Sequence, residues 1–186
     1  MPLADFSRSS SSRRSAPEVG LRTALLDQIA YLASEADALQ TMISRLPGAV
    51  LETHPIPGEM SVKELYALLL RYDEELHRPF VDDLLRGANP SLSLRKPHDL
   101  IAGSPWNQIP ISQILSRLAE SRRQLVARCE AAPDADWARI GTAYGEAVDL
   151  FAYLFHVVQH DVEILRALGE RLHEARLSDR LVGFAG

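Results

Sequence analysis

Apolar side chains recur at helical spacing over most of the chain. In its first third they step alternately by three and four positions, which keeps them on one face of a helix. This stripe consists of Leu25, Ile29, Leu32, Ala36, Leu39, Ile43 and Leu46. Ser15 and Glu18 have the spacing of a capping box before it, and Pro47-Gly48 breaks the pattern after it. The pattern predicts a first helix over residues 16–46.

A second helix is marked at its start by another capping box, in which Ser61 is followed three residues later by Glu64. Pro79 has no N–H group and its ring crowds the carbonyl four residues back, so we expect a kink or an end near His77. Residues 87–110 contain several prolines and show no sustained period. We predict that this segment is a long connection that crosses the bundle.

Two more helices complete the pattern. The third is predicted over residues 111–131, where Pro133 stops it, and the fourth over residues 145–175. Short alternating runs of β-branched residues, which would indicate strands, are missing. The predicted fold is therefore an all-α four-helix bundle with one long crossover between its second and third helices. The fourth helix is apolar almost all round from Ala147 to Val158, so we expect a second subunit to cover it, forming a homodimer.

Composition and charge narrow the class of protein. The chain has 186 residues, 46% hydrophobic and 24% charged, which is typical of one globular domain, placed here at residues 16–180. Residues 1–15 are rich in serine and arginine and lack the apolar run of a secretory signal. They are interpreted as a flexible tail, with an organelle transit peptide as the alternative. A formal net charge of −5 argues against a nucleic-acid partner.

The location of the protein is predicted from two further features. The chain contains no unbroken run of about 18 apolar residues, which predicts that it has no membrane span. Its single cysteine, Cys129, cannot form an internal disulfide, and this favours a reducing compartment, the cytoplasm. Cys129 also lies on the apolar stripe of the third helix, so inert packing is favoured over a role as a nucleophile.

Two histidines have the spacing of metal ligands. His156 and His160 lie one turn apart on the predicted fourth helix, so both imidazoles could reach one Zn²⁺, Ni²⁺ or Fe²⁺ ion. The alternative is a pair of boundary histidines that hydrogen-bond to their neighbours. Asp161 falls inside the apolar stripe of the same helix, where a carboxylate must be paired or protonated. It is interpreted as half of an interhelical salt bridge, or else as a support for a ligating histidine or a general base.

Two segments resemble the DinB/YfiT-like superfamily of four-helix bundles: residues 59–69, around the second capping box, and residues 160–166 on the fourth helix. The order of the helices and the long central crossover are similar as well, and the resemblance covers residues 18–175. It implies a homodimer and a divalent metal held by one histidine of the second helix and two of the fourth. It also implies an activity among thiol-dependent transferases, isomerases and metal-dependent hydrolases.

The chain departs from this family pattern at the metal ligands. The resemblance places ligands at Leu68 and Ile164, which cannot coordinate a metal, and leaves only His160 in place. A surviving site would need His156 together with a shifted ligand on the second helix near Tyr72 or Asp73, and neither of these is an obvious substitute for imidazole. His77 lies about 180° round a regular helix from Leu68, which disfavours it.

Three functions are therefore open. The leading hypothesis is a DinB-like bundle with a degenerate metal pocket that binds a small molecule and no cofactor. The first alternative is a metal-dependent hydrolase or thiol transferase that uses His156 and His160, with Asp161 in support. The second is a protein-interaction module, in which either the apolar face of the fourth helix or Trp106 in the crossover contacts a partner.

Overall fold

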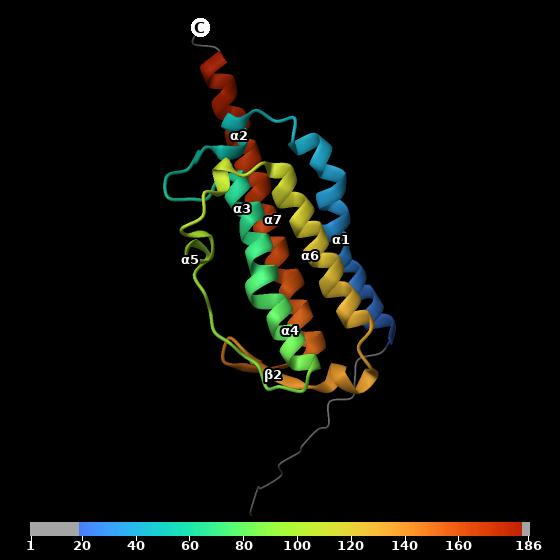
Figure 1. The fold of residues 1–186 in the computed structure, drawn as a ribbon. Coiled ribbons are helices and arrows are strands. Elements are labelled where there is room, and N and C mark those ends of the chain that lie inside the picture. Colours follow the sequence, from blue (N-terminus) through green and yellow to red (C-terminus); the bar gives the residue numbers. More distant parts are fainter. Residues whose placement is uncertain (1–18, 184–186) are drawn as a thin grey trace, which may run out of the picture.

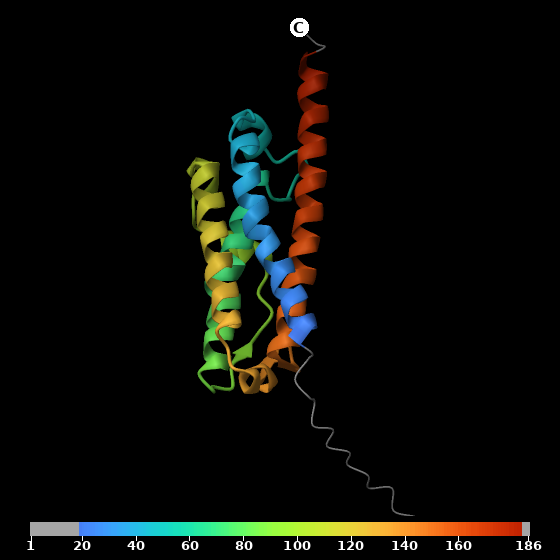
Figure 2. The ribbon, with the colours of Figure 1, turned by 90° about the vertical axis from the view of Figure 1, so that its right-hand side faces the viewer.

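Four long helical segments pack side by side in the computed structural model, which describes residues 19–183, with side chains described as far as Ala175. Two of them, α1 and α7, run in one direction, and the other two run in the opposite direction (Figures 1 and 2). This arrangement confirms the predicted all-α bundle. The segments are α1 (Val19–Ile43), α3 (Val62–Tyr72) continued by the π-turn η1 (Asp73–His77) and α4 (Arg78–Leu85), α6 (Ile111–Glu130), and α7 (Leu150–Gly183).

The first helix ends slightly earlier than predicted. After Ile43 the chain turns, and Pro47 leads into a short helix, α2 (Gly48–Glu52), which packs against α3 and α7. Helix α1 itself packs most extensively against α6. The predicted tail over residues 1–15 and the capping box of Ser15 and Glu18 lie outside the described residues.

The second helix begins as predicted but does not end near His77. The Ser61 hydroxyl accepts a hydrogen bond from the Glu64 amide at 3.2 Å, and the Glu64 carboxylate accepts one from the Ser61 amide at 2.8 Å. Near its middle the helix widens into η1, where the Arg78 amide donates to the carbonyl of Asp73, five residues back. The wider turn lies directly before Pro79, which has no N–H to donate, and the helix then continues as α4.

The crossover runs along the bundle from the end of α4 to the start of α6 (Figure 1). It contains the short strand β1 (Ser91–Leu92), the helix α5 (Pro97–Ile101) and the turn η2 (Trp106–Gln108). Trp106 is buried in the core, and its indole N–H donates to the carbonyl of Ile101 at 3.1 Å. A buried indole that is already hydrogen-bonded favours a packing role for Trp106, and contact of this residue with a partner stays an untested prediction.

Strands do occur, contrary to the prediction. Strand β1 pairs in parallel with β2 (Ile140–Ala143), which pairs in antiparallel with β3 (Glu146–Asp149), so α7 begins at Leu150 and not at residue 145. Tyr144 and Gly145 join β2 to β3 with φ angles of +55° and +88°. Positive φ at both central residues is what a two-residue hairpin turn needs. The sequence of β2 lacks the usual run of β-branched residues because glycine occupies position 141. A Cβ on Gly141 would lie 2.8 Å from the Phe80 ring.

Buried polar residues divide the apolar core in two. On each of three segments, one turn of polar residues lies between apolar residues of one core cluster and those of the other. We call this set the polar layer; it consists of Asp73, His77, Arg122 and Asp161, all of them buried. Burial of charge at this depth requires pairing, so the layer is the first place to look for a site.

The structure bears on two further predictions, the absence of a membrane span and the formation of a homodimer. None of the helices in residues 19–183 is long and apolar enough to cross a membrane. On α7, Phe155 and Val162 are exposed, so an apolar outer face is present. The homodimer expected from this face stays a prediction.

Candidate functional site

Arg122 holds the polar layer together. Its Nε atom lies 2.8 Å from Asp73 Oδ2, and its Nη2 donates a hydrogen bond to Asp161 Oδ1 at 2.6 Å. The three side chains come from the π-turn η1, from α6 and from α7, so the guanidinium links three helical segments. The ion pair of Asp161 is the interhelical salt bridge that its place in the apolar stripe indicates.

The charges in this layer do not balance. One guanidinium neutralises one carboxylate, and the second carboxylate is left in a low-dielectric interior. Burial therefore raises the pKa of Asp73 to about 7, although Arg122 acts in the opposite direction. Burial also raises the pKa of Asp161, again against the effect of Arg122. Burial thus favours the protonated form of the carboxylates of this layer more than water does.

His77 faces the interior because of the π-turn. In a regular helix it would lie about 180° from Leu68, but the extra residue of the turn takes away about 100° of that rotation. His77 consequently stacks on Tyr72, with ring centroids 5.8 Å apart, and lies 6.1 Å from the ring of His160. Its Nδ1 is 3.0 Å from the hydroxyl of Tyr153 on α7. The expectation that His77 points away from the site was wrong, since it assumed an unbroken helical register.

Burial keeps His77 neutral. The imidazole is enclosed by Tyr72 on its own segment, by Arg122 on α6, and by Tyr153 and His160 on α7. Burial, with smaller effects of Arg122 and His160, lowers the pKa of His77 well below its usual value. Its Nε2 is buried and has no hydrogen-bond partner among the described residues.

This environment predicts a pH dependence of stability. Because the pKa of His77 is lower in the folded than in the unfolded protein, its contribution is present above the ordinary histidine pKa and is lost as the pH falls. We expect the free energy of unfolding of wild type to fall relative to that of His77→Gln below about pH 6.5, by up to ~1.4 kcal/mol per pH unit. Urea unfolding of both proteins across this range measures the difference.

The comparison isolates His77 from other titrating groups. The raised pKa of Asp73 has the opposite effect on the slope, but it is common to both proteins and largely cancels. His98→Gln is the matched control, because His98 is exposed in the crossover and should leave the pH profile of wild type unchanged. Parallel profiles for wild type and His77→Gln would contradict the assignment.

Beside the polar layer lies a cavity of about 230 Å³, which we call the histidine cavity. Tyr72 and Leu76 line it from the second helix, Tyr144 from the tip of the β2–β3 hairpin, and Leu94 and Arg95 from the crossover. Helix α7 forms a polar side with His156, Gln159, His160 and Glu163. The structure therefore brings both predicted histidines to one cavity.

His160 is the more enclosed of these two histidines. Its ring meets that of Tyr72 edge to face, with centroids 4.0 Å apart, and its Nδ1 is buried with no hydrogen-bond partner in the described part of the chain. Burial lowers the pKa of His160, against an opposing effect of Glu163. A neutral imidazole with one buried nitrogen can meet a ligand in the cavity only through its other nitrogen, Nε2.

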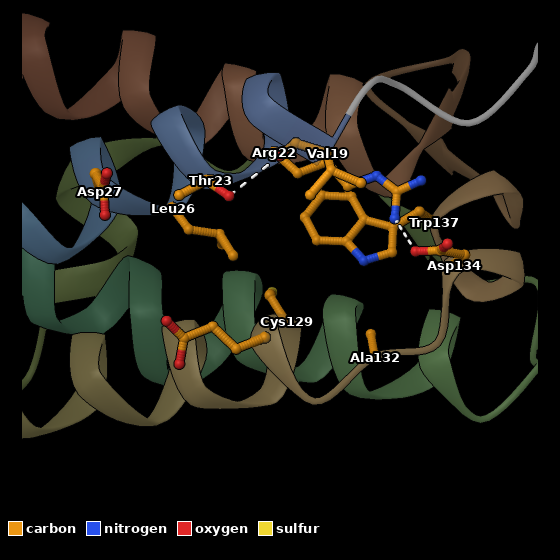
Figure 3. Close-up of a pocket in the computed structure, with 10 residues that line it drawn as sticks. Val19, Arg22, Thr23, Leu26, Asp27, Cys129, Ala132, Asp134 and Trp137 are labelled. Atoms are coloured by element: carbon orange, nitrogen blue, oxygen red, sulfur yellow. Dashed lines mark hydrogen bonds and ion pairs between the residues drawn. The ribbon is translucent and has the colours of Figure 1, made fainter.

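A second cavity, of about 240 Å³, lies at the other side of the bundle between α1, the end of α6 and the turn η3 (Asp134–Ala138). Figure 3 shows the Arg22 guanidinium between the Trp137 ring and Asp134. Its Cζ lies 5.1 Å from the centroid of the ring, and its Nη1 lies 2.6 Å from Asp134 Oδ1. Cys129 lines this cavity, and burial raises its pKa to about 12. A thiol with this pKa remains protonated at neutral pH and is a poor nucleophile, as its apolar position predicted.

Some of these residues could have been identified from the sequence. Arg122 follows Leu118 by four residues and precedes Leu125 by three, so it lies in the apolar stripe of its helix just as Asp161 does in its own. An arginine and an aspartate in two facing apolar stripes indicate a buried ion pair. Tyr144 carries no such pattern, because only the hairpin brings it to the cavity.

The fold defines an all-α bundle protein with a cavity between its second helix, its crossover and its last helix. A family model described as the DinB superfamily matches residues 30–163, and the chain belongs to this superfamily. All residues that line the histidine cavity fall inside the matched segment, whereas half of those around the second cavity precede it. The searches of curated proteins and of solved structures give no significant match.

The residues of this chain do not fit the metal that the family resemblance implies. Leu68 and Ile164, at two of the three implied ligand positions, are buried in the apolar core. Among the side chains described, residues 19–175, no three of histidine, cysteine, aspartate or glutamate come together in a way that could hold an ion. His77 and His160 approach each other but lack a third donor, and structural or catalytic sites need at least three protein ligands.

Proposed function

We propose that this DinB-superfamily protein binds a small, largely apolar molecule in the histidine cavity. The observation that carries the proposal is the composition of the cavity: aromatic and aliphatic side chains from the second helix, the hairpin and the crossover, together with four polar residues of α7 and Arg95 of the crossover. Small-molecule sites have this composition, with polar groups that orient a ligand whose affinity comes mainly from apolar contact. The site lies between helices of a bundle, where such ligands commonly bind.

The polar layer gives the cavity a rigid wall. Tyr72, which contacts His160, is adjacent in sequence to Asp73, and Asp161 is adjacent to His160. Both carboxylates pair with Arg122, so the backbone that carries Tyr72 and His160 is linked to α6 by ion pairs. A ligand that binds a preformed wall loses little free energy to ordering of the protein.

His160 is proposed to orient the ligand by hydrogen bonding. Because its pKa is lowered, the ring is neutral at physiological pH and can accept or donate one hydrogen bond, but it offers no positive charge to an anion. The enzyme alternative would use His156 and His160 as metal ligands, and it lacks a third ligand among the described residues. Binding without metal is therefore the function that these residues support best.

The test compares His160→Ala with a matched histidine variant. A fragment screen by protein-observed NMR should find molecules that shift the resonances of cavity residues in wild type. His173→Ala is the control and should respond in the same way, because His173 is exposed on the same helix. In His160→Ala the polar fragments should bind at least about tenfold more weakly, which corresponds to one hydrogen bond.

Two outcomes would reject the proposal. One is that no fragment binds at the histidine cavity of wild type. The other is that elemental mass spectrometry finds stoichiometric Zn²⁺, Ni²⁺ or Fe²⁺ in wild type and none in His160→Ala, which would support the metal-dependent alternative.

A further inference from the structure

Tyr144 occupies a backbone conformation that a tyrosine rarely adopts. It is the described residue other than glycine with a positive φ, at +55°, and it takes the first central position of the β2–β3 turn. Asparagine, aspartate and glycine are preferred there, because a bulky side chain at positive φ crowds the backbone. A strained residue that persists at a site is a reason to look for a function.

The side chain of Tyr144 is not used by the fold itself. It lines the histidine cavity and is partly exposed, and it makes no ring contact or side-chain hydrogen bond with the residues described. Its phenol is nevertheless close enough to those of Tyr72 and Tyr153 to raise the pKa of both, second to the effect of burial. The strained turn therefore aims an unpartnered aromatic ring at the cavity.

The rest of the cavity indicates what this ring would contact. Tyr72 supplies a second aromatic ring from the end of α3, and Leu76 and Leu94 supply apolar surface. The lining contains one basic and one acidic side chain, Arg95 and Glu163, and Arg95 lies 3.5 Å from Glu75. Two aromatic rings, apolar surface and no net charge favour a neutral planar molecule.

The volume sets the size of this molecule. An apolar cavity of about 150 Å³ accepts one benzene ring. At about 230 Å³ the histidine cavity has room for two fused rings with one small substituent. Such a molecule would place its rings beside Tyr72 and Tyr144, and a hydroxyl substituent could donate to the neutral His160.

We propose that the ligand of the histidine cavity is a neutral bicyclic aromatic alcohol, with its rings against Tyr144 and Tyr72 and its hydroxyl on His160. This proposal rests on the proposed function and makes it specific. Tyr144 then determines specificity, and the strain of its turn is retained because the ring contributes to binding.

The experiment uses 2-naphthol, whose fluorescence reports binding directly, and the full-length protein. We expect wild type to bind 2-naphthol, and naphthalene, which lacks the hydroxyl, to compete about tenfold more weakly. The saturated analogue 2-decalol should also compete about tenfold more weakly, because it cannot stack.

Substitution of Tyr144 separates binding from folding. Tyr144→Asn suits the positive φ, so its melting temperature should equal or exceed that of wild type, while its affinity for 2-naphthol falls about tenfold. Tyr31→Asn is the matched control, because Tyr31 is an exposed tyrosine of α1 away from the cavity, and it should bind as wild type does.

The outcomes distinguish this inference from the proposed function. Equal affinity of wild type and Tyr144→Asn, or 2-decalol binding as tightly as 2-naphthol, overturns the inference. If other fragments bind the cavity and 2-naphthol does not, the inference fails and the proposed function stands. If no fragment binds there, both fail.

Discussion

Arg122→Met is expected to lower the free energy of unfolding by about 3–5 kcal/mol at neutral pH, the largest effect of any single exchange of a charged residue. Methionine keeps much of the length of the side chain but removes the charge. Asp73 and Asp161 would then lose the ion-pair partner that they share, Arg122. Urea unfolding followed by circular dichroism measures the change.

The matched control for this prediction is the next residue of the same helix. Arg123 is half exposed and pairs with Asp37 at the surface, so Arg123→Met should change the free energy of unfolding by about 1 kcal/mol at most. Similar losses for the two variants would contradict the role given to Arg122.

Acidification provides a second check on Arg122→Met. Without the guanidinium, the pKa values of Asp73 and Asp161 should rise further in the folded state. A carboxylate whose pKa is raised by folding contributes stability at low pH that is lost as the pH rises through the folded pKa. The deficit of Arg122→Met relative to wild type should therefore shrink between about pH 7 and pH 5. A constant deficit would mean that the loss comes from packing and not from charge.

Trp106→Ala is expected to lower the free energy of unfolding by about 3–5 kcal/mol, as for other large aromatic residues removed from a core. Trp106 is 5% exposed, and its indole N–H satisfies the buried carbonyl of Ile101. The exchange leaves a cavity and an acceptor without its donor, and both lower stability. Chemical unfolding measures the loss.

The control for Trp106 lies in the same crossover. Leu94 is 83% exposed, and Leu94→Ala should change the free energy of unfolding by no more than about 0.5 kcal/mol. If Trp106 instead contacted a partner from the surface, Trp106→Ala would unfold at the same denaturant concentration as wild type. The two variants therefore distinguish a core residue from an interaction residue within one segment.

The polar layer connects the helical segments that surround the histidine cavity. Leu68 and Ile164 lie in the apolar core, whereas His160 lines the cavity, with the rings of Tyr72 and His77 near its own. The buried ion pairs of Arg122 hold the surrounding segments at fixed positions. The cavity beside His160 is thus formed by the packing of the bundle, its crossover and the β2–β3 hairpin.

The presence and order of the four helices were predictable from the sequence alone, although several of their ends were not. Apolar residues at intervals of three and four, together with the capping box of Ser61 and Glu64, depend only on residues close together in the chain. The buried pairing of Asp161 followed in the same way, because a carboxylate in an apolar stripe must find a partner. The family resemblance was also visible at this level, in residues 59–69 and 160–166.

Tertiary structure alone decided where the cavity residues lie. The inward position of His77 depends on the π-turn before Pro79, which changes the helical register without changing the pattern of apolar residues. Tyr144 reaches the cavity because β2 pairs with β1 of the distant crossover and packs Gly141 under Phe80. Local periodicity records which face of a segment is buried. It does not indicate which distant segment covers that face. The histidine cavity is formed by contacts between such distant segments, so its lining could not be predicted.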